Sequence, residues 1–393
     1  WEATEFHFDL EKLEGIAGAA AQLGAELFVL DDGWFGVRNN DRQGLGDWGV
    51  NEEKLPGGLE RLSERVRALG LDFGVWVEPE MVSEDSELYR AHPDWALTAP
   101  GRAPTRGRSQ LVLDLTRPEV REYVYRSMGQ VLSCPGLVYV KWDMNRALTD
   151  VWSGALPAAR QGEVCHRYVL AVYELLERVR RDYPHLLIEG CAGGGGRFDA
   201  GMLYYTPQIW CSDNTDALDR LGIQCGTSFA YPAGTVGAHV SAVPNGQTCR
   251  SIPMETRGVV AMAGTFGYEL DVRRCTEEEK AVIRRQIAFF KEHWDVIQNG
   301  DAYRLTDAFR PGAFTAWQQV SADRRRSLVS LVTGGASSNP PFAVLRLKGL
   351  DPDVCYQVNG EGAWPGDVLM QAGWPLPMFW NDYQPMQLYL SAV

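Results

Sequence analysis

The sequence predicts an α/β protein with a (β/α)8 TIM barrel over residues 1–300, followed by a C-terminal antiparallel β-sandwich domain over residues 301–393. Compact apolar runs, many ending in polar residues, alternate about eight times with segments of helical periodicity, which is typical of a parallel sheet with helical crossovers. After Asp301 this periodicity ends, and short strand-like runs separated by Gly, Pro and Asp follow. The number of repeats favours a closed barrel over an open sheet.

The individual elements follow from local patterns. Residues 11–23 carry alanines and leucines at helical spacing before Gly24, and Pro118 occupies the first position of a later helix. The expected barrel strands are 26–30, 72–77, 110–115, 137–140, 186–190, 208–211, 224–229 and 259–265. The expected helices are 11–23, 58–69, 118–133, 163–181, 217–221 and 276–297. The expected strands of the second domain are 314–318, 327–333, 342–347 and 386–390.

The stretch at 137–146 joins a buried strand to polar side chains. Its apolar residues predict the strand, which delivers Lys141, Asp143 and Asn145 to one edge of the sheet. That edge is where parallel α/β folds keep their chemistry. Lys141 and Asp143 are two residues apart and share a face, so an ordinary buried ion pair between them is the alternative interpretation.

Polar side chains follow most of the other predicted strands, and in a barrel these strand ends converge on one mouth. Acids and tryptophans dominate there, as in a sugar site, because the C–H faces of a pyranose stack on rings while its hydroxyls need acceptors. The polar residues are Asp31, Asp32, Glu78, Glu80, Lys141, Asp143, Glu189, Asp213 and Asp216. The tryptophans among them are Trp34, Trp76, Trp142 and Trp210.

Two carboxylates suffice to hydrolyse a glycosidic bond. If they lie about 5–5.5 Å apart, one can act as nucleophile and the other as general acid and then base. Asp143 and Asp213 both follow apolar strands directly, and neither is well placed to cap a helix. The residues alone leave open which acid takes which role.

Other acids have simpler structural interpretations. A cap on the following helix is the better interpretation for Asp216 and an alternative for the adjacent pair Asp31 and Asp32. Glu80 could form an ion pair with Arg90.

Composition and motif spacing exclude several classes of function. The net charge of −13 argues against nucleic acid or an anionic membrane as partner and suits a neutral polar ligand. No segment reaches the apolar length of a membrane span. No Gly-x-Gly-x-x-Gly follows the first strand, no Walker motif occurs, and the six histidines lack metal-ligand spacing, so we expect no cofactor and no metal.

The eight cysteines are scattered without a Cys-x-x-Cys pair, which does not resemble a disulfide framework or a zinc site in a chain of 393 residues. We therefore expect a reducing compartment, the cytoplasm. The sequence begins at Trp1 without a basic and then apolar leader, so no secretion signal is predicted.

Five strings resemble glycoside hydrolase family 36, the bacterial α-galactosidases of the raffinose and melibiose type. They occur in the order of that family, and the β-rich tail is similar to the family's C-terminal domain. The strings are Leu-Asp-Asp-Gly-Trp at 30–34, Trp-Val-Glu-Pro-Glu-Met at 76–81, Lys-Trp-Asp-Met-Asn-Arg at 141–146, Cys-Ala-Gly-Gly-Gly-Gly-Arg-Phe-Asp at 191–199 and Cys-Ser-Asp-Asn-Thr-Asp at 211–216.

The resemblance implies a retaining double displacement that releases terminal α-linked galactose, mainly α-1,6-linked, from sugars such as melibiose and raffinose. It implies that Asp143 is the nucleophile and Asp213 the general acid/base. It also implies that Lys141 donates to a sugar hydroxyl, and its charge beside Asp143 would keep that carboxylate ionised. The further substrate-binding residues that it implies are Trp1, Asp31, Asp32, Trp76, Arg108, Cys191 and Gly194.

Larger members of the family carry an N-terminal β-sandwich domain with oligomer contacts, and nothing in this sequence corresponds to it. A homo-oligomer is still an expectation. Two other functions stay open: an α-N-acetylgalactosaminidase or other retaining α-glycosidase, and a galactoside-binding protein without catalysis. Cys191 and the glycines after it favour a sugar with a free 2-hydroxyl, and the presence of both carboxylates argues against lost catalysis.

Overall fold

The computed structural model describes residues 1–309, 312–340 and 342–393, and these group into two compact units. Unit 1 comprises residues 1–210 with 271–273, and unit 2 comprises residues 211–270 with 274–393. The domain boundary between residues 300 and 301 stays a prediction. Within the described ranges, no helix has both the length and the apolar character needed to cross a membrane.

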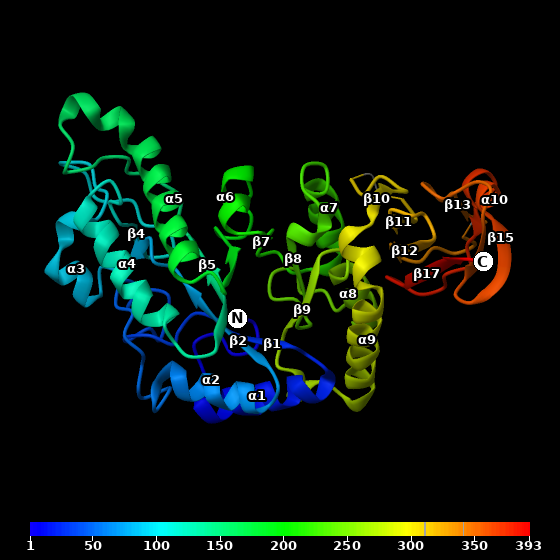
Figure 1. Cartoon of the computed structure of the whole chain (residues 1–393), viewed down its shortest axis with the longest axis horizontal. Coiled ribbons are helices and arrows are strands. Elements are labelled where there is room, and N and C mark those ends of the chain that lie inside the picture. The colour runs from blue at the N-terminus through cyan, green and yellow to red at the C-terminus, as the bar shows by residue number, and fades with distance from the viewer. Residues whose placement is uncertain (310–311, 341) are drawn as a thin grey trace. The chain divides into compact units, whose positions relative to one another are not determined.

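Unit 1 alternates strands and helices along the chain (Figure 1). Its strands are β1 (Leu27–Leu30), β2 (Asp72–Val77), β3 (Met81–Val82), β4 (Leu111–Val112), β5 (Leu137–Trp142), β6 (Leu187–Gly190) and β7 (Gln208–Trp210). Its α-helices are α1 (Leu10–Leu23), α2 (Gly58–Ala68), α3 (Glu87–Ala91), α4 (Pro118–Leu132), α5 (Val164–Asp182) and α6 (Ala200–Tyr205), and short 3-10 turns are η1 (Pro93–Trp95) and η2 (Ala158–Glu163).

Five of these strands form a parallel sheet in the order β1-β2-β5-β6-β7. Five of the six residues of β2 are buried, as expected of a parallel strand that is covered on both faces. Helices α1 and α2 contact each other, as do α4 and α5 (Figure 1). Because the strands are parallel, their carboxyl ends lie at one edge of the sheet, which places the residues that follow them together.

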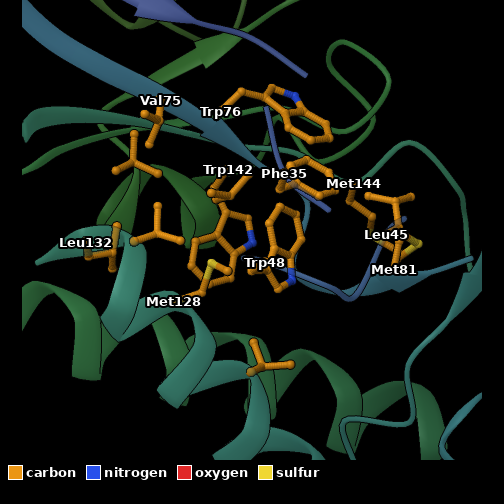
Figure 2. Packing of buried hydrophobic residues seen from close by; sticks show 14 of the residues in the cluster. Phe35, Leu45, Trp48, Val75, Trp76, Met81, Met128, Leu132, Trp142 and Met144 are labelled. Atoms are coloured by element: carbon orange, nitrogen blue, oxygen red, sulfur yellow. The ribbon is translucent and has the colours of Figure 1, made fainter. Parts of the chain in front are cut away.

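Aromatic side chains dominate part of the core of unit 1 (Figure 2). The ring of Phe35 lies 4.4 Å from that of Trp48 and stacks on that of Trp76 at 6.3 Å, measured between centroids. Trp142 of β5 is buried in the same cluster. Rings packed from several elements leave little freedom to reorient, so this core fixes the direction of the Trp76 indole.

Unit 2 contains two further parallel strands and an antiparallel sheet. Its strands are β8 (Val236–Ser241), β9 (Thr265–Glu269), β10 (Asp301–Arg304), β11 (Phe314–Val320), β12 (Arg326–Thr333), β13 (Val344–Leu345), β14 (Cys355–Val358), β15 (Glu361–Pro365), β16 (Trp374–Pro375) and β17 (Pro385–Ala392). Its helices are α7 (Ala217–Thr227), η3 (Ala233–Thr235), α8 (Met254–Ala261), α9 (Glu277–Asn299) and α10 (Gly366–Gln371), and the turn η4 (Val272–Arg274) lies where the chain passes between the units.

In unit 2, β8 and β9 pair in parallel, and six strands form an antiparallel sheet in the order β10-β11-β12-β17-β14-β15. A separate two-stranded pair joins β13 and β16. The predicted tail strands at 314–318, 327–333 and 386–390 are therefore present, and the run at 342–347 contains the short β13.

Three predicted strands of the parallel sheet are wrong. Residues 224–227 of the run at 224–229 form the last turn of helix α7, and residues 259–265 begin inside helix α8. Val259 and Val260 are buried in that helix, so packing outweighs their preference for strands. Residues 110–115 contribute only β4, which pairs antiparallel with β3 outside the parallel sheet. The strands β8 and β9 were not predicted.

Candidate active site

Asp143 lies immediately after β5, buried, with both carboxylate oxygens engaged. Its Oδ2 accepts hydrogen bonds from Trp76 Nε1 at 3.0 Å and from Asn145 Nδ2 at 2.8 Å. Its Oδ1 accepts from the backbone N–H of Met144 at 2.8 Å and of Gly193 at 3.4 Å. These partners are all N–H donors, and together they hold both oxygens of the carboxyl group in one orientation.

The predicted aromatic wall Trp76 is itself part of the core. Its side chain is 2% exposed, and its ring stacks on Phe35 (Figure 2). Trp34 Nε1 donates to the carbonyl oxygen of Trp76 at 2.9 Å. The structure therefore places the Trp76 indole as a rigid donor to Asp143.

The two acids after β1, Asp31 and Asp32, each pair with a different cation. Asp32 is buried and receives three hydrogen bonds of 2.8–3.2 Å from Arg38, which is fully buried. Burial raises the pKa of Asp32, and the hydrogen bonds and charge of Arg38 oppose that rise. Asp31 accepts from Lys141 Nζ at 3.0 Å. Neither acid caps a helix, so the cap proposed as an alternative for this pair is wrong.

Lys141 reaches across the sheet to β1. Its ion pair with Asp31 joins residues from the ends of β5 and β1, and its ammonium nitrogen lies 5.8 Å from the ring centroid of Trp210. The ion-pair partner that the structure identifies for Lys141 is therefore Asp31, in place of the pair with Asp143 that the spacing suggested.

Lys54 stabilises the turn after β1 by hydrogen bonds to backbone carbonyl groups. Its ammonium donates to the carbonyl oxygens of Phe6, Gly33 and Arg38 at 2.8–3.1 Å. Gly33 has φ 108°, and a Cβ there would approach the rings of Phe6 and Phe8 to 3.1–3.2 Å. A glycine after the two acids is therefore required both by backbone conformation and by space.

The glycine-rich loop after β6 supplies a donor to Asp143. Cys191 is buried, and its N–H donates to the carbonyl oxygen of Trp142 at 2.9 Å, while the carbonyl oxygen of buried Gly194 accepts from Ala192 at 2.8 Å. Gly193 has φ 55° and presents its N–H to Asp143. The loop thus forms part of the same site as β5.

Glu80 fixes the end of this loop. Its buried carboxylate accepts from Arg197 Nη1 at 2.8 and 3.1 Å, from Trp142 Nε1 at 2.9 Å and from the Tyr168 hydroxyl at 2.8 Å. The alternative pairing of Glu80 with Arg90 is wrong, because Arg90 pairs with Asp85 and Glu87.

Glu78, at the end of β2, is a fully buried acid beside the site. It accepts hydrogen bonds from the backbone N–H of Asn145 and, at 3.1 Å, from Gln110 Nε2. Burial and the nearby charge of Asp143 raise the pKa of Glu78 to about 8. This acid therefore holds its proton at neutral pH.

The remaining predicted residues lie as follows. Trp1 packs edge-on against Phe6 with ring centroids 4.9 Å apart. Arg108 is exposed, with a left-handed backbone of φ 49°, and its charge opposes part of the rise that burial causes in the pKa of Asp32. Asp213 belongs to unit 2, in the loop after β7, with an exposed side chain; its carbonyl oxygen accepts from Gln247 Nε2 at 3.2 Å.

The predicted helix cap at Asp216 is confirmed. Its Oδ1 accepts from the N–H groups of Leu218 and Asp219 at 3.0 and 3.1 Å at the start of α7. Arg250 adds an ion pair to the same oxygen at 2.6 Å.

Several site residues were not assigned a role from the sequence. Arg38 lies in a Gly- and Asn-rich loop, where nothing marks it as a partner of Asp32. Asn145 carried a signal, since it follows the β5 strand in the same string as Asp143. Glu78 was predicted only as a polar residue at a strand end, and Gly193 only as one of four consecutive glycines.

Within residues 1–309, 312–340 and 342–393, no cluster of three or more His, Cys, Asp or Glu side chains is arranged to hold a metal ion.

The sequence and the fold of this chain are similar to those of known proteins. The Melibiase family model matches residues 1–300, and the model of the glycosyl hydrolase family 36 C-terminal domain matches residues 314–390. The chain belongs to the melibiase family, glycosyl hydrolase family 36. This family membership was predicted from the five strings, and it is confirmed.

Relatives of this melibiase-family chain include α-galactosidase AgaA of Geobacillus stearothermophilus, 53% identical over all of this chain and 54% of the relative. The bifunctional α-galactosidase/sucrose kinase AgaSK of Mediterraneibacter gnavus is 51% identical over 98% of the chain and 40% of the relative. The chain spans about half the length of the curated relatives it matches, or less.

The crystal structure of AgaA superimposes with a TM-score of 0.98 over all of this chain and 55% of that one. Structures of AgaA variants with raffinose or stachyose, 52% identical, give the same TM-score and coverage. The predicted fold class of this melibiase-family chain, a TIM-like parallel β/α fold followed by an antiparallel sheet domain, is thereby confirmed; the described residues contain seven parallel strands of the predicted eight.

We expect Arg38→Met to destabilise the protein by about 3–5 kcal/mol, because it leaves the buried Asp32 without its cation. Removal of Arg38 also raises the pKa of Asp32 further, so the loss should shrink as the pH falls and Asp32 takes up a proton. Urea denaturation at pH 7 and pH 4.5 measures both effects. Arg90→Met, which removes an exposed cation that also pairs with two acids, is the matched control, and an equal loss in both variants would contradict the prediction.

Proposed function

We propose that this chain carries the catalytic machinery of a retaining, exo-acting α-galactosidase that releases terminal α-linked galactose, mainly α-1,6-linked, from sugars such as melibiose and raffinose. The observation that supports this most is the setting of Asp143, a buried carboxylate held by N–H donors in a member of the melibiase family. The relative AgaA, variants of which bind raffinose and stachyose in crystals, supports the substrate class.

The proposed reaction has two displacements at the anomeric carbon. Asp143 attacks that carbon while Asp213 gives its proton to the departing glycosidic oxygen, which forms a β-galactosyl-enzyme. Asp213 then takes a proton from water, whose oxygen attacks the same carbon and releases Asp143 and α-galactose. Asp213 must therefore bind its proton more tightly than Asp143 does before the first step.

Recognition of galactose is proposed for the acids after β1 and the groups near them. Asp31 and Asp32 accept hydrogen bonds from adjacent sugar hydroxyls, and Lys141 donates one. The ion pairs with Lys141 and Arg38 support this role, because they fix the orientation of two carboxyl groups at one strand end. Five further residues are proposed to contact the sugar. Trp1 and Trp76 are the proposed aromatic walls, Arg108 a polar contact, and Cys191 and Gly194 the contacts near the 2-position.

Competing substrates and product stereochemistry test the function. We expect turnover of an aryl α-galactoside, with α-galactose as the first anomer in proton NMR spectra, and little turnover of the matching α-N-acetylgalactosaminide. β-Galactose as the first product would contradict retention. Faster release of N-acetylgalactosamine would favour the other glycosidase, and binding of galactose without turnover of either glycoside would favour a binding protein.

We further propose residues 1–300 as the catalytic domain and residues 301–393 as a C-terminal domain, in agreement with the ranges of the two family models. A reducing, cytoplasmic location is proposed, supported by free thiols at Cys134, Cys165, Cys225, Cys249 and Cys355. A homo-oligomer is proposed as the assembly, and light scattering of the purified protein would measure it.

A further inference from the structure

Glu78 is fully buried beside Asp143 and has no part in the mechanism proposed above. Strands β2 and β5 pair in parallel with Val77 opposite Trp142, and the N–H of Asp143 donates to the carbonyl oxygen of Val77 at 2.8 Å. Glu78 and Asp143 are the next residues on these two strands. Two carboxyl groups therefore follow neighbouring strand ends.

Asn145 connects these two carboxyl groups. Its backbone N–H donates to Glu78 Oε1, and its side-chain Nδ2 donates to Asp143 Oδ2 at 2.8 Å. Gln110 Nε2 donates to the other oxygen of Glu78 at 3.1 Å. A displacement of Glu78 would thus move the backbone of Asn145 and with it a donor to Asp143.

The charges around Glu78 favour its neutral form. The charged groups that act on it are Asp143 after β5 and Asp32 after β1, and the charge of Asp32 is already paired with Arg38. The groups that bond to Glu78, Asn145 and Gln110, are uncharged. The side-chain oxygen of Gln110 is buried without a partner, so this amide can turn and accept the proton of Glu78. Two carboxylates this close repel when both are ionised, so one keeps a proton, and the complete burial of Glu78 selects Glu78.

We propose that Glu78 is a neutral positioning residue, whose protonated carboxyl fixes Asn145 and through it the orientation of Asp143. This inference rests on the proposed function of Asp143. Ionisation of Glu78 would place a second negative charge beside Asp143 and shift the nucleophile. A misplacement of about 1 Å can cost about 10²-fold in rate.

Two variants and a substrate with a good leaving group test the proposal. Fluoride leaves without a proton, so hydrolysis of α-galactosyl fluoride reports on Asp143 without the titration of the general acid. We expect kcat/KM of the wild type to fall above a midpoint near pH 8, where Glu78 loses its proton. Glu78→Gln, a neutral isostere, should keep kcat at pH 6 within about threefold and lack this fall.

Glu78→Ala removes the acceptor for Asn145. We expect kcat to fall by about 10–100-fold with little change in KM, because the nucleophile is misplaced while sugar contacts remain. Glu87→Gln, which removes an exposed acid at the start of α3 outside the site, is the control and should keep the fall near pH 8. Wild-type kcat in Glu78→Ala, or an unchanged alkaline fall in Glu78→Gln, would overturn the proposal.

A spectroscopic measurement on the wild type tests the protonation of Glu78 even if the variants fail to fold. It needs no turnover, so its result does not depend on the proposed function. Wild-type protein carrying ¹³C-carboxyl glutamate should show the infrared C=O band of a protonated Glu at pH 7, lost near pH 8. Absence of this band at pH 7 would overturn the assignment of a neutral Glu78, whatever the enzyme hydrolyses. Its presence together with no hydrolysis of any galactoside would refute the catalytic proposal alone.

Discussion

Replacing Asp143 by Asn is expected to lower kcat/KM for α-galactosides by at least about 10⁴-fold, because no side chain then forms the bond to the anomeric carbon. The variant should fold, with a moderate loss of stability. Each oxygen of Asp143 accepts two N–H donors, and an Asn amide can place an acceptor toward only one of these pairs. The other pair then faces an NH₂ group, at a cost of about 1–3 kcal/mol. Initial rates and circular dichroism of the variant measure the two effects.

Chemical rescue sharpens the test of Asp143. In Asp143→Gly the lost carboxylate leaves space, and added azide is expected to restore turnover of α-galactosyl fluoride with β-galactosyl azide as product. Asp182→Asn, at the exposed C-terminal end of α5, is the control and should retain full activity. Substantial turnover of an unactivated galactoside by Asp143→Asn would remove Asp143 from its role.

The parts of the site that could be predicted are those carried by strand ends. β2 and β5 combine clear apolar runs with parallel pairing, so Glu78, Asp143 and Lys141 were all expected at one edge of the sheet. Periodicity identifies such strands, and the topology then brings their ends together without further information.

The pairing within the site could not be predicted, because it depends on contacts distant in sequence. Glu80 pairs with Arg197, from the loop after β6, although the nearby Arg90 looked suitable. Lys141 pairs with Asp31 although Asp143 is two residues away. A buried acid must have a hydrogen-bond donor, and the donor is whichever group the fold places beside it. Spacing along the sequence does not show which group that is.

The errors in unit 2 have a local cause. The run at 259–265 is rich in β-branched and small residues, yet its first part is the buried helix α8. Strand β8 contains Gly237, Ala238 and His239, which give a weak strand signal, and is identified by its pairing with β9. In both cases tertiary packing decides between conformations that local preference does not separate.

Replacing Asp213 by Asn is expected to act according to the leaving group. With melibiose, kcat/KM should fall by about 10²–10⁴-fold, because the departing oxygen no longer receives a proton in the transition state. With α-galactosyl fluoride the loss in the first step should be small, since fluoride leaves unassisted. A series of aryl α-galactosides measures this: the slope of log kcat/KM against leaving-group pKa should be steeper in the variant than in the wild type.

Asp216→Asn provides the matched control for Asp213, three residues away in the same string. Asn caps a helix about as well as Asp, so α7 keeps its N-terminus. The substitution removes the charge that pairs with Arg250, and it turns an NH₂ group toward the Thr248 hydroxyl, which can accept as well as donate. A disturbance of this loop in general would slow all substrates by a similar factor, whereas loss of a proton donor slows poor leaving groups most. Equal losses for all leaving groups in Asp213→Asn would therefore indicate a disturbed loop and count against the acid role. A steeper slope in Asp213→Asn, with the wild-type slope in Asp216→Asn, would support the role of Asp213 as proton donor.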